Sequence, residues 1–217
     1  MKKTISIEEA VTHIQDGMTV MVGGFLGCGS PHKLIDALVE KGVKDLTLIC
    51  NDTAFPDAGV GKMVVNKQFK KIITSHIGTN PETGRQMNEN ETEVNLVPQG
   101  SLAEKIRAGG AGLGGILTPT GVGTEVEEGK EKMVIEGKTY LLELPLKADV
   151  ALIFGHKVDT KGNVLYQGAE RNFNPLMATA ADIVIVEAEQ VVAVGELDPN
   201  EVMTPGIFVN YIVGGDK

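Results

Sequence analysis

A glycine-rich segment carries the clearest chemical pattern in this sequence. The apolar run Met18–Val22 predicts a buried strand, and the segment follows it directly with Gly23, Gly24, Phe25, Leu26, Gly27, Cys28 and Gly29. Ser30 then suits a helix cap and Pro31 a first helical position. Glycine allows close approach of a ligand to the backbone, and a helix N-terminus offers unpaired N–H groups. The segment therefore indicates a site for a phosphate or a developing oxyanion. A strand-to-helix turn that binds nothing is the alternative.

Thiol chemistry is a second possibility in the same segment. Cys28 precedes the predicted helix and His32 follows four residues later, so the two side chains could form a nucleophilic pair. The competing interpretation of Cys28 is a small packing residue. Cys50 ends an apolar run and is expected in the core. With two cysteines in all, a disulfide scaffold is excluded, and reduced thiols in a cytoplasmic protein are expected.

Carboxylates and histidines give weaker signals. Asp52 follows a predicted strand and Glu170 lies in a polar segment; their placement alone makes them candidates for catalysis. Glu170 is expected to form an ion pair with its neighbour Arg171. His76 also follows a predicted strand, where it could line a site or serve the structure alone. The four histidines lack metal-ligand spacing, so no metal centre is expected.

Two amide side chains occupy equivalent positions in the chain. Asn51 follows the predicted strand Leu46–Cys50, and Gln99 follows the predicted strand Glu93–Val97. In a parallel sheet the carboxyl ends of the strands share one edge, and ligands bind there. Amides at that edge could fix a small carboxylate or carbonyl by hydrogen bonds. Asn51 and Gln99 are therefore expected to line a substrate pocket.

A dinucleotide fingerprint is present without its structural context. Residues 110–115 match the spacing G-x-G-x-x-G, but a helix and not a strand is predicted before them. The loop after Met18–Val22 has the right context, yet it lacks that spacing and has no P-loop lysine. The residues therefore give hydride transfer little support.

The elements that must position these residues alternate between strands and helices. Further strands are expected at Lys71–Ser75, Val150–Phe154 and Asp182–Val186, with a hairpin at Met133–Leu142. Helices are expected after the capping boxes Ser6–Glu9 and Ser101–Glu104, the second ending near Arg107, and at Asn174-Pro175. Asn80–Gly84 suggests a turn, and Glu125–Glu131 a solvated loop. The alternation predicts an α/β three-layer sandwich with a mainly parallel sheet of the Rossmann-like kind, in one domain over residues 1–217.

Composition and charge narrow the class of protein. The chain has 217 residues, a formal net charge of −9 and 42% hydrophobic residues, as in an ordinary globular domain. A net-acidic chain without a basic stripe is a poor partner for nucleic acid. The uncharged stretches at 17–32 and 108–124 are short and rich in glycine, so no membrane span is expected.

The segment Asp16–Pro31 resembles the first motif of the family I coenzyme A transferases. That motif consists of Asp-Gly, an apolar triplet, Gly-Gly-Phe and Gly-x-Pro, and every position matches. The resemblance continues to residue 175 through six more segments, which are Asn51–Thr53, Ser75–Pro81, Pro98–Gly100, Arg107–Gly112, Thr118–Thr124 and Arg171–Pro175. Essentially the whole chain is similar to alpha subunits of the acetate/acetoacetate (butyrate–acetoacetate) type.

The resemblance implies a CoA-transferase fold and a ping-pong transfer of CoA from an acyl-CoA to a free carboxylate. In the family, a glutamate in a Ser-Glu-Asn-Gly motif of the beta subunit is the nucleophile. This sequence lacks the motif; Asn88-Glu89-Asn90 is the nearest string. The resemblance therefore implies no catalytic residue on this chain, no permanently bound cofactor, and CoA as a substrate. It also implies that Gly23–Gly29 is the CoA-binding loop, that Asn51 and Gln99 line the carboxylate pocket, and that the assembly is an α2β2 hetero-oligomer.

Two rival functions remain open at this stage. The chain could be a self-sufficient acyl-CoA thioesterase that uses Cys28 or Glu170, or a non-catalytic α/β module that binds a small molecule. The preferred acid among acetate, butyrate and acetoacetate depends on both chains of a two-chain enzyme. The sequence of one chain therefore leaves it open.

Overall fold

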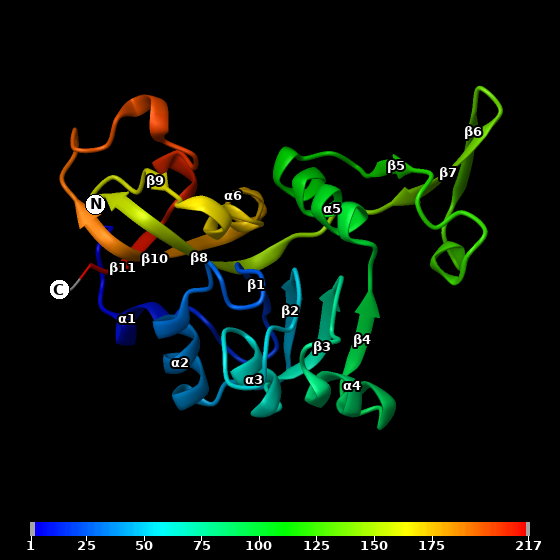
Figure 1. The fold of residues 1–217 in the computed structure, drawn as a ribbon, viewed down its shortest axis with the longest axis horizontal. Helices are drawn as coiled ribbons and strands as arrows, with labels where there is room; N and C mark the ends of the chain where they lie inside the picture. Colours follow the sequence, from blue (N-terminus) through cyan, green and yellow to red (C-terminus); the bar gives the residue numbers. More distant parts are fainter. Residues whose placement is uncertain (1–2, 216–217) are drawn as a thin grey trace.

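A sheet of seven parallel strands forms the centre of the computed structural model, which describes residues 3–215 (Figure 1). The spatial order is β11-β10-β8-β1-β2-β3-β4, with β9 (Val164–Leu165) antiparallel to β8. The strands are β1 (Thr19–Val22), β2 (Leu46–Cys50), β3 (Phe69–Thr74), β4 (Glu93–Leu96), β8 (Ala148–Asp159), β10 (Ala181–Val192) and β11 (Tyr211–Gly214). All their pairings along this path are parallel, which confirms the predicted α/β fold with a mainly parallel sheet.

Helices cover both faces of the sheet and enclose two apolar cores. One core packs Leu34, Leu38 and Met63 from the helices against Val20 and Leu152 from the strands. The other core contains Leu102, Ile106 and Met177. The helices are α1 (Ile7–Val11), α2 (His32–Lys41), α3 (Gly61–Val65), α4 (Pro81–Asn88), α5 (Gln99–Ala111) and α6 (Asn174–Met177).

Strand β1 lies in the middle of the sheet and determines where the glycine-rich segment emerges. Its last residue, Val22, pairs with Cys50 of β2 and with Leu152 of β8. Gly23 therefore leaves the sheet at the same edge as Asn51. Because β1 is apolar and buried on both faces, its register is fixed by packing as well as by hydrogen bonds.

A second, smaller sheet extends away from the main body (Figure 1). Its antiparallel strands are β5 (Ile116–Thr118), β6 (Lys132–Ile135) and β7 (Lys138–Glu143), in the order β5-β7-β6. The pairing of β6 with β7 confirms the predicted hairpin. The buried carboxylate of Glu143 ties this sheet to the body through Lys105 of α5, at 2.8 Å. The short 3-10 helices are η1 (Glu125–Glu127), η2 (Gly168–Arg171), η3 (Pro199–Glu201) and η4 (Gly206–Phe208).

Helix starts are the least accurate part of the sequence-based predictions. The Ser6 hydroxyl accepts from the N–H of Glu9, as predicted. The capping box at Ser101 is wrong, because α5 begins two residues earlier at Gln99 and continues beyond Arg107 to Ala111. The predicted turn at residues 80–84 is the start of α4: Asn80 accepts from the N–H of Glu82 and Pro81 is the first helical residue. Ser30 does not cap α2 either. The cap residue is Pro31, and no side chain at the cap accepts a hydrogen bond from the first turn of the helix.

Candidate functional site

The glycine-rich loop folds as a narrow two-residue turn at the carboxyl end of β1. Phe25 and Cys28 exchange two backbone hydrogen bonds, each of 2.9 Å, across Leu26 and Gly27. Both intervening residues have positive φ, 51° at Leu26 and 88° at Gly27, as in the type I′ turns that close β-hairpins. The loop therefore has a defined conformation that its own backbone maintains.

Asp52 holds the tip of this turn. Its carboxylate oxygens accept from the N–H of Leu26 at 3.1 and 3.2 Å, and one of them accepts from the N–H of Ala54 at 2.7 Å. Burial raises the pKa of Asp52, and the donors Leu26 and Ala54 oppose that rise. The carboxylate, 3% exposed as a residue, is therefore occupied in fixing the loop. These hydrogen bonds account for the presence of a carboxylate at this strand end.

Two asparagines hold the loop from the other side. The amide oxygen of Asn172 accepts from the N–H of Gly24 at 3.1 Å, and its amide nitrogen donates to the carbonyl of Cys28 at 3.1 Å. The fully buried Asn174 donates to the carbonyl of Gly29 at 2.9 Å. A Cβ on Gly23 would lie 1.8 Å from the Asn174 amide oxygen. The amides thus occupy the space that a side chain in the loop would need.

Gly24 also requires glycine for its backbone conformation. Its φ is 124°, a region that L-residues rarely adopt, and a Cβ there would lie 2.0 Å from the Ser30 hydroxyl oxygen. The Ser30 side chain thus packs against Gly24 and does not cap α2.

The loop keeps two N–H groups free. The N–H groups of Gly24, Phe25, Leu26 and Cys28 all donate within the protein. Within residues 3–215, the N–H groups of Gly27 and Gly29 have no acceptor. Each of these two backbone donors is therefore available to a ligand oxygen.

Asn51 and Gln99 are brought together, as the sequence predicts. The Gln99 amide nitrogen donates to the Asn51 amide oxygen at 2.8 Å, and the Ser75 hydroxyl donates to the Gln99 amide oxygen. Asn51 is buried and Gln99 is exposed. The Asn51 amide nitrogen donates to no atom of the described residues, so it remains available for a ligand. Since Asn51 directly precedes Asp52, this amide pair adjoins the glycine loop.

The two cysteines lie in different environments. Cys28 is exposed on the loop, and His32 does not pair with it: the His32 Nε2 atom is 3.0 Å from the carbonyl oxygen of Gly27. The structure therefore does not assemble the nucleophilic pair considered for these residues. Cys50 is buried as predicted, and burial raises the pKa of its thiol.

Glu170 caps a short helix, and His76 lies beside Asp52. The predicted ion pair of Glu170 with Arg171 is wrong: the Glu170 carboxylate accepts from the N–H of Gln167 at 3.1 Å and caps η2. This backbone donor is the cap residue of the same short helix, which favours the local contact. His76 is exposed, and its backbone pairs with that of Asp52. Sequence reasoning about individual residues did not find Asn172 and Asn174, whose functional signal appears only in the motif Arg171–Pro175.

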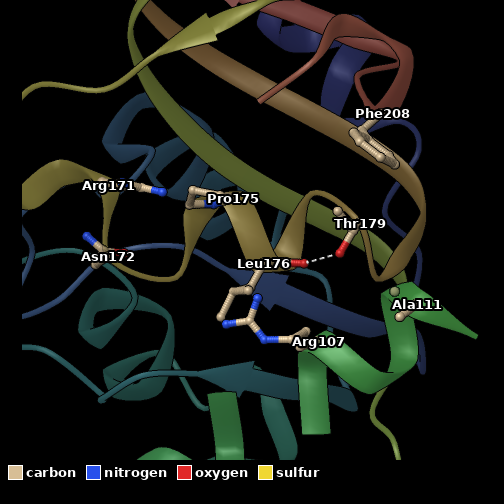
Figure 2. A pocket seen from close by; sticks show the side chains of 9 residues that line it. Arg107, Ala111, Arg171, Asn172, Pro175, Leu176, Thr179 and Phe208 are labelled. Atoms are coloured by element: carbon tan, nitrogen blue, oxygen red, sulfur yellow. Dashed lines mark hydrogen bonds between the residues drawn. The ribbon is translucent and has the colours of Figure 1, made fainter. Parts of the chain in front are cut away.

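An arginine-lined cavity lies beside the loop, between α5 and α6 (Figure 2). Its volume is about 450 Å³, and Arg107, Arg171 and Asn172 are among its lining residues. Asn172 thus belongs both to this cavity and to the support of the loop. Among residues 3–215, no cluster of His, Cys, Asp or Glu has the arrangement of a metal centre. None of the helices described combines the length and apolar character needed to cross a membrane.

Comparisons with known proteins agree with this geometry. The family profile described as Coenzyme A transferase matches residues 4–215. Acetate CoA-transferase subunit alpha of Escherichia coli (strain K12) is 58% identical over 211 residues, which cover 97% of this chain and 96% of that protein. The acetoacetyl-CoA:acetate/butyrate CoA transferase alpha subunit of Clostridium acetobutylicum is 56% identical, with 97% of each chain covered.

Solved structures share the fold at lower sequence identity. An acyl-CoA transferase of Escherichia coli O157:H7, solved as a thioester complex with CoA, gives a TM-score of 0.87 at 24% identity over 98% of this chain and 47% of that chain. Glutaconate coenzyme A-transferase from Acidaminococcus fermentans gives 0.84 at 19% identity over 97% of this chain and 75% of that one. The likeness of these structures concerns the fold. Taken with the profile match over nearly the whole length, it leaves one conclusion: the chain belongs to the coenzyme A transferase family.

Proposed function

We propose that this chain is the alpha subunit of a short-chain acyl-CoA:acetate/acetoacetate CoA-transferase, whose nucleophilic glutamate lies on a beta partner. The names of the two most similar relatives reported above support the alpha assignment. The observation that carries the chemical proposal is the pair of free N–H groups at Gly27 and Gly29, beside the amides of Asn51 and Gln99. The free N–H groups suit an oxyanion, and the two amides suit a carboxylate.

The loop would act at the first chemical step. The partner's glutamate carboxylate attacks the thioester carbonyl, and the carbonyl oxygen becomes an oxyanion that the free N–H groups stabilise. CoA leaves as the thiolate and an acyl–glutamyl anhydride remains. The thiolate then attacks the glutamyl carbonyl, the first acid departs as a carboxylate, and a glutamyl-CoA thioester forms. The second acid reverses these steps. One lost oxyanion donor costs about 10²–10³ in rate in well-studied enzymes.

The support around the loop serves this role because it needs no rearrangement during the reaction. Asp52, Asn172 and Asn174 already bond the N–H groups of Leu26 and Gly24 and the carbonyls of Cys28 and Gly29. Backbone donors that are fixed in advance stabilise developing charge without a cost of reorientation. CoA enters as a substrate in this proposal, and we propose no resident cofactor. We further propose an α2β2 assembly in the cytoplasm, which the mass of the co-purified complex would test.

The decisive experiment is reconstitution with a chain that carries Ser-Glu-Asn-Gly. This chain alone should be inactive, and the mixture should transfer CoA from acetoacetyl-CoA to acetate. Borohydride reduction after acyl-CoA treatment should modify the partner's glutamate, as read by peptide mass spectrometry. A modified residue on this chain, or transfer by this chain alone, would contradict the proposal.

The carboxylate pocket has its own test. Gln99→Ala removes a donor for the acid and leaves Asn51 without its partner. A hydrogen bond to a charged group contributes about 1.5–3 kcal/mol, so kcat/KM for the acid should fall by about 10- to 150-fold. Asn95→Ala is the matched control, since Asn95 is an exposed amide of β4 that bonds only Glu93 among the described residues. Equal kinetics for the two variants would remove Gln99 from the pocket.

A further inference from the structure

Helix α2 starts directly after the glycine loop, yet its first turn lacks a local cap. The cap residue Pro31 has no side-chain acceptor. The N–H of His32 donates to the Ser30 carbonyl at 3.0 Å, and the first intrahelical bond runs from Ile35 to Pro31. The N–H groups of Lys33 and Leu34, at the second and third helical positions, therefore need acceptors from elsewhere.

Glu187, 153 residues away in sequence, supplies that acceptor. It lies on β10 between pairings with Phe154 of β8 and Val213 of β11. Its carboxylate accepts from the N–H of Leu34 at 2.9 Å, and the residue is 5% exposed. A carboxylate of the sheet thus accepts the hydrogen bond that a Ser, Asp or Asn at the cap position accepts in many helices.

Backbone N–H groups are the main stabilisers of the buried Glu187 carboxylate. No Lys, Arg or His of the described residues forms an ion pair with it. Burial raises the pKa of Glu187, while the N–H groups of Leu34 and Lys33 and the charges of His32 and Lys33 oppose the rise. Replacing a poorly compensated buried charge by an apolar side chain is often neutral or favourable for stability. Packing alone therefore does not explain a carboxylate at this point of the sheet.

The first turn of α2 is continuous with the part of the loop that carries the free donors. Ser30 donates to the Gly27 carbonyl at 3.3 Å and its own carbonyl accepts from His32. The free N–H groups of Gly27 and Gly29 lie immediately before this turn. A shift of the helix start would therefore move them.

We infer that Glu187 is a positioning residue for the glycine loop, acting through the first turn of α2. The inference rests on the proposed role of the loop as the thioester site. Asp52 and the two asparagines hold the loop directly, whereas Glu187 fixes the helix into which the loop leads. Its contribution to the reaction comes from reach and geometry, because its carboxylate touches Leu34 and no part of the loop itself.

Two substitutions separate the effect of side-chain length at Glu187 from the effect of its charge. Glu187→Asp keeps the charge but shortens the side chain by one methylene, so the carboxylate no longer reaches Leu34. Glu187→Gln loses the charge but keeps the length, and its amide oxygen can still accept from Leu34. In the reconstituted complex, we expect Glu187→Asp to lower kcat with acyl-CoA about tenfold, the equivalent of one lost hydrogen bond. Its KM for the acid should not change, and Glu187→Gln should stay within about threefold of wild type.

Two further variants complete the experiment. Val186→Ala is the control, because Val186 is equally buried on β10 but packs in the opposite core. It should lower the Tm without changing kcat. Pro31→Asp places an acceptor at the cap position of α2, within reach of Lys33 and Leu34. In the Glu187→Asp background, it should restore most of the lost kcat.

Hydrogen exchange keeps the test independent of activity. In the isolated chain, Glu187→Asp should increase exchange over residues 27–34 and Val186→Ala should not. Unchanged exchange there would overturn the inference, whatever the complex does. A Glu187→Asp complex that loses Tm without losing kcat would also overturn the inference. Failure of Pro31→Asp to restore kcat in the Glu187→Asp background would do the same. A wild-type complex without transferase activity would contradict the proposed function alone.

Discussion

Two glycine-rich segments, residues 23–29 and 109–115, use the same residue for different physical purposes. In the first, glycine permits a tight turn that leaves the N–H groups of Gly27 and Gly29 without an acceptor among the described residues. In the second, helix α5 continues through Gly109 and Gly110 and ends at Gly112, whose φ of 69° forms a left-handed C-cap. The dinucleotide-fingerprint spacing of the second segment thus lies at the end of a helix and not in a loop between a strand and a helix.

The glycines inside α5 allow close packing between elements. A Cβ on Gly109 would lie 1.9 Å from the Leu146 carbonyl oxygen, and one on Gly110 would lie 2.1 Å from the Thr179 hydroxyl oxygen. Glycine in a helix costs about 1 kcal/mol relative to alanine, so this close approach offsets a real penalty. The comparison teaches that a glycine pattern acquires meaning from the element before it: a strand before residues 23–29, a helix before residues 109–115.

The largest expected effect comes from a side chain in the loop. Gly24→Val should lower kcat/KM for acyl-CoA by more than about 10²-fold, since the loop must change shape to relieve both the positive φ and the contact with Ser30. Steady-state kinetics and thermal melting of the complex are the measurements. Gly84→Ala is the control, because a Cβ there has no neighbour within 4 Å. A folded Gly24→Val complex with normal kinetics would make the loop a mere turn.

The second segment should respond in stability and not in catalysis. Gly110→Val places atoms against Thr179 and should cost about 1–3 kcal/mol of unfolding free energy, the usual range for overpacking. The kcat of the folded complex should stay within about twofold of wild type. Activity assays at a temperature well below the Tm of the variant would measure this. Thr179→Ala should recover part of the stability in a double variant. A selective loss of kcat would instead assign this segment to the site.

The support of the glycine loop by Asp52 should make the stability of the chain depend on pH. Its pKa is raised in the folded chain, so the folded state binds more protons than the unfolded state, and this group destabilises the fold as pH rises above the usual aspartate range. Asp52→Asn, whose amide oxygen can still accept from Leu26 and Ala54, should therefore gain Tm relative to wild type at pH 7 and lose that gain toward pH 4. Asp52→Ala should be destabilised by about 1–3 kcal/mol at either pH. An identical dependence of Tm on pH in Asp52→Asn and wild type would contradict this.

The smallest effect is expected at Cys28. Its N–H donates to Phe25 and its carbonyl accepts from Asn172, so the backbone of this residue matters and the thiol makes no hydrogen bond in the described structure. Cys28→Ala should keep kcat within about threefold of wild type. A decrease above about 10³-fold, as for a deleted nucleophile, would restore thiol catalysis.

Sequence reasoning located elements and edges well, because these depend on local patterns. Apolar runs revealed the strands around β1, and Asn51 and Gln99 could be placed together since parallel strands share an edge. The Asn80-Pro81 start of α4 was also readable in principle as a cap followed by proline. Strand β8 continues from Gly155 to Asp159 and β10 from Glu187 to Val192, and both extensions contain polar residues, so the strands are longer than the apolar runs.

The roles of single polar residues were harder to predict. Asp52 at a strand end has the same local sequence whether it is an acid catalyst or a support for Leu26. Asn172 and Glu187 act on groups 148 and 153 residues away, and no local pattern encodes such distances. Knowledge of the tertiary fold is needed before their hydrogen bonds can be assigned.

The order of the strands also has a consequence for folding during synthesis. Strand β1 pairs with β2 on one side and with β8 on the other, and the groups that clamp its loop follow about 145 residues later. When the chain emerges from the ribosome N-terminus first, β1 to β4 can associate while one edge of β1 stays open. Contacts of such long sequence separation form slowly, and open strand edges favour misassociation. The loop therefore lacks its asparagine contacts until the segment after β8 has been synthesised, and we expect a chain truncated before β8 to lose the ordered conformation of the loop.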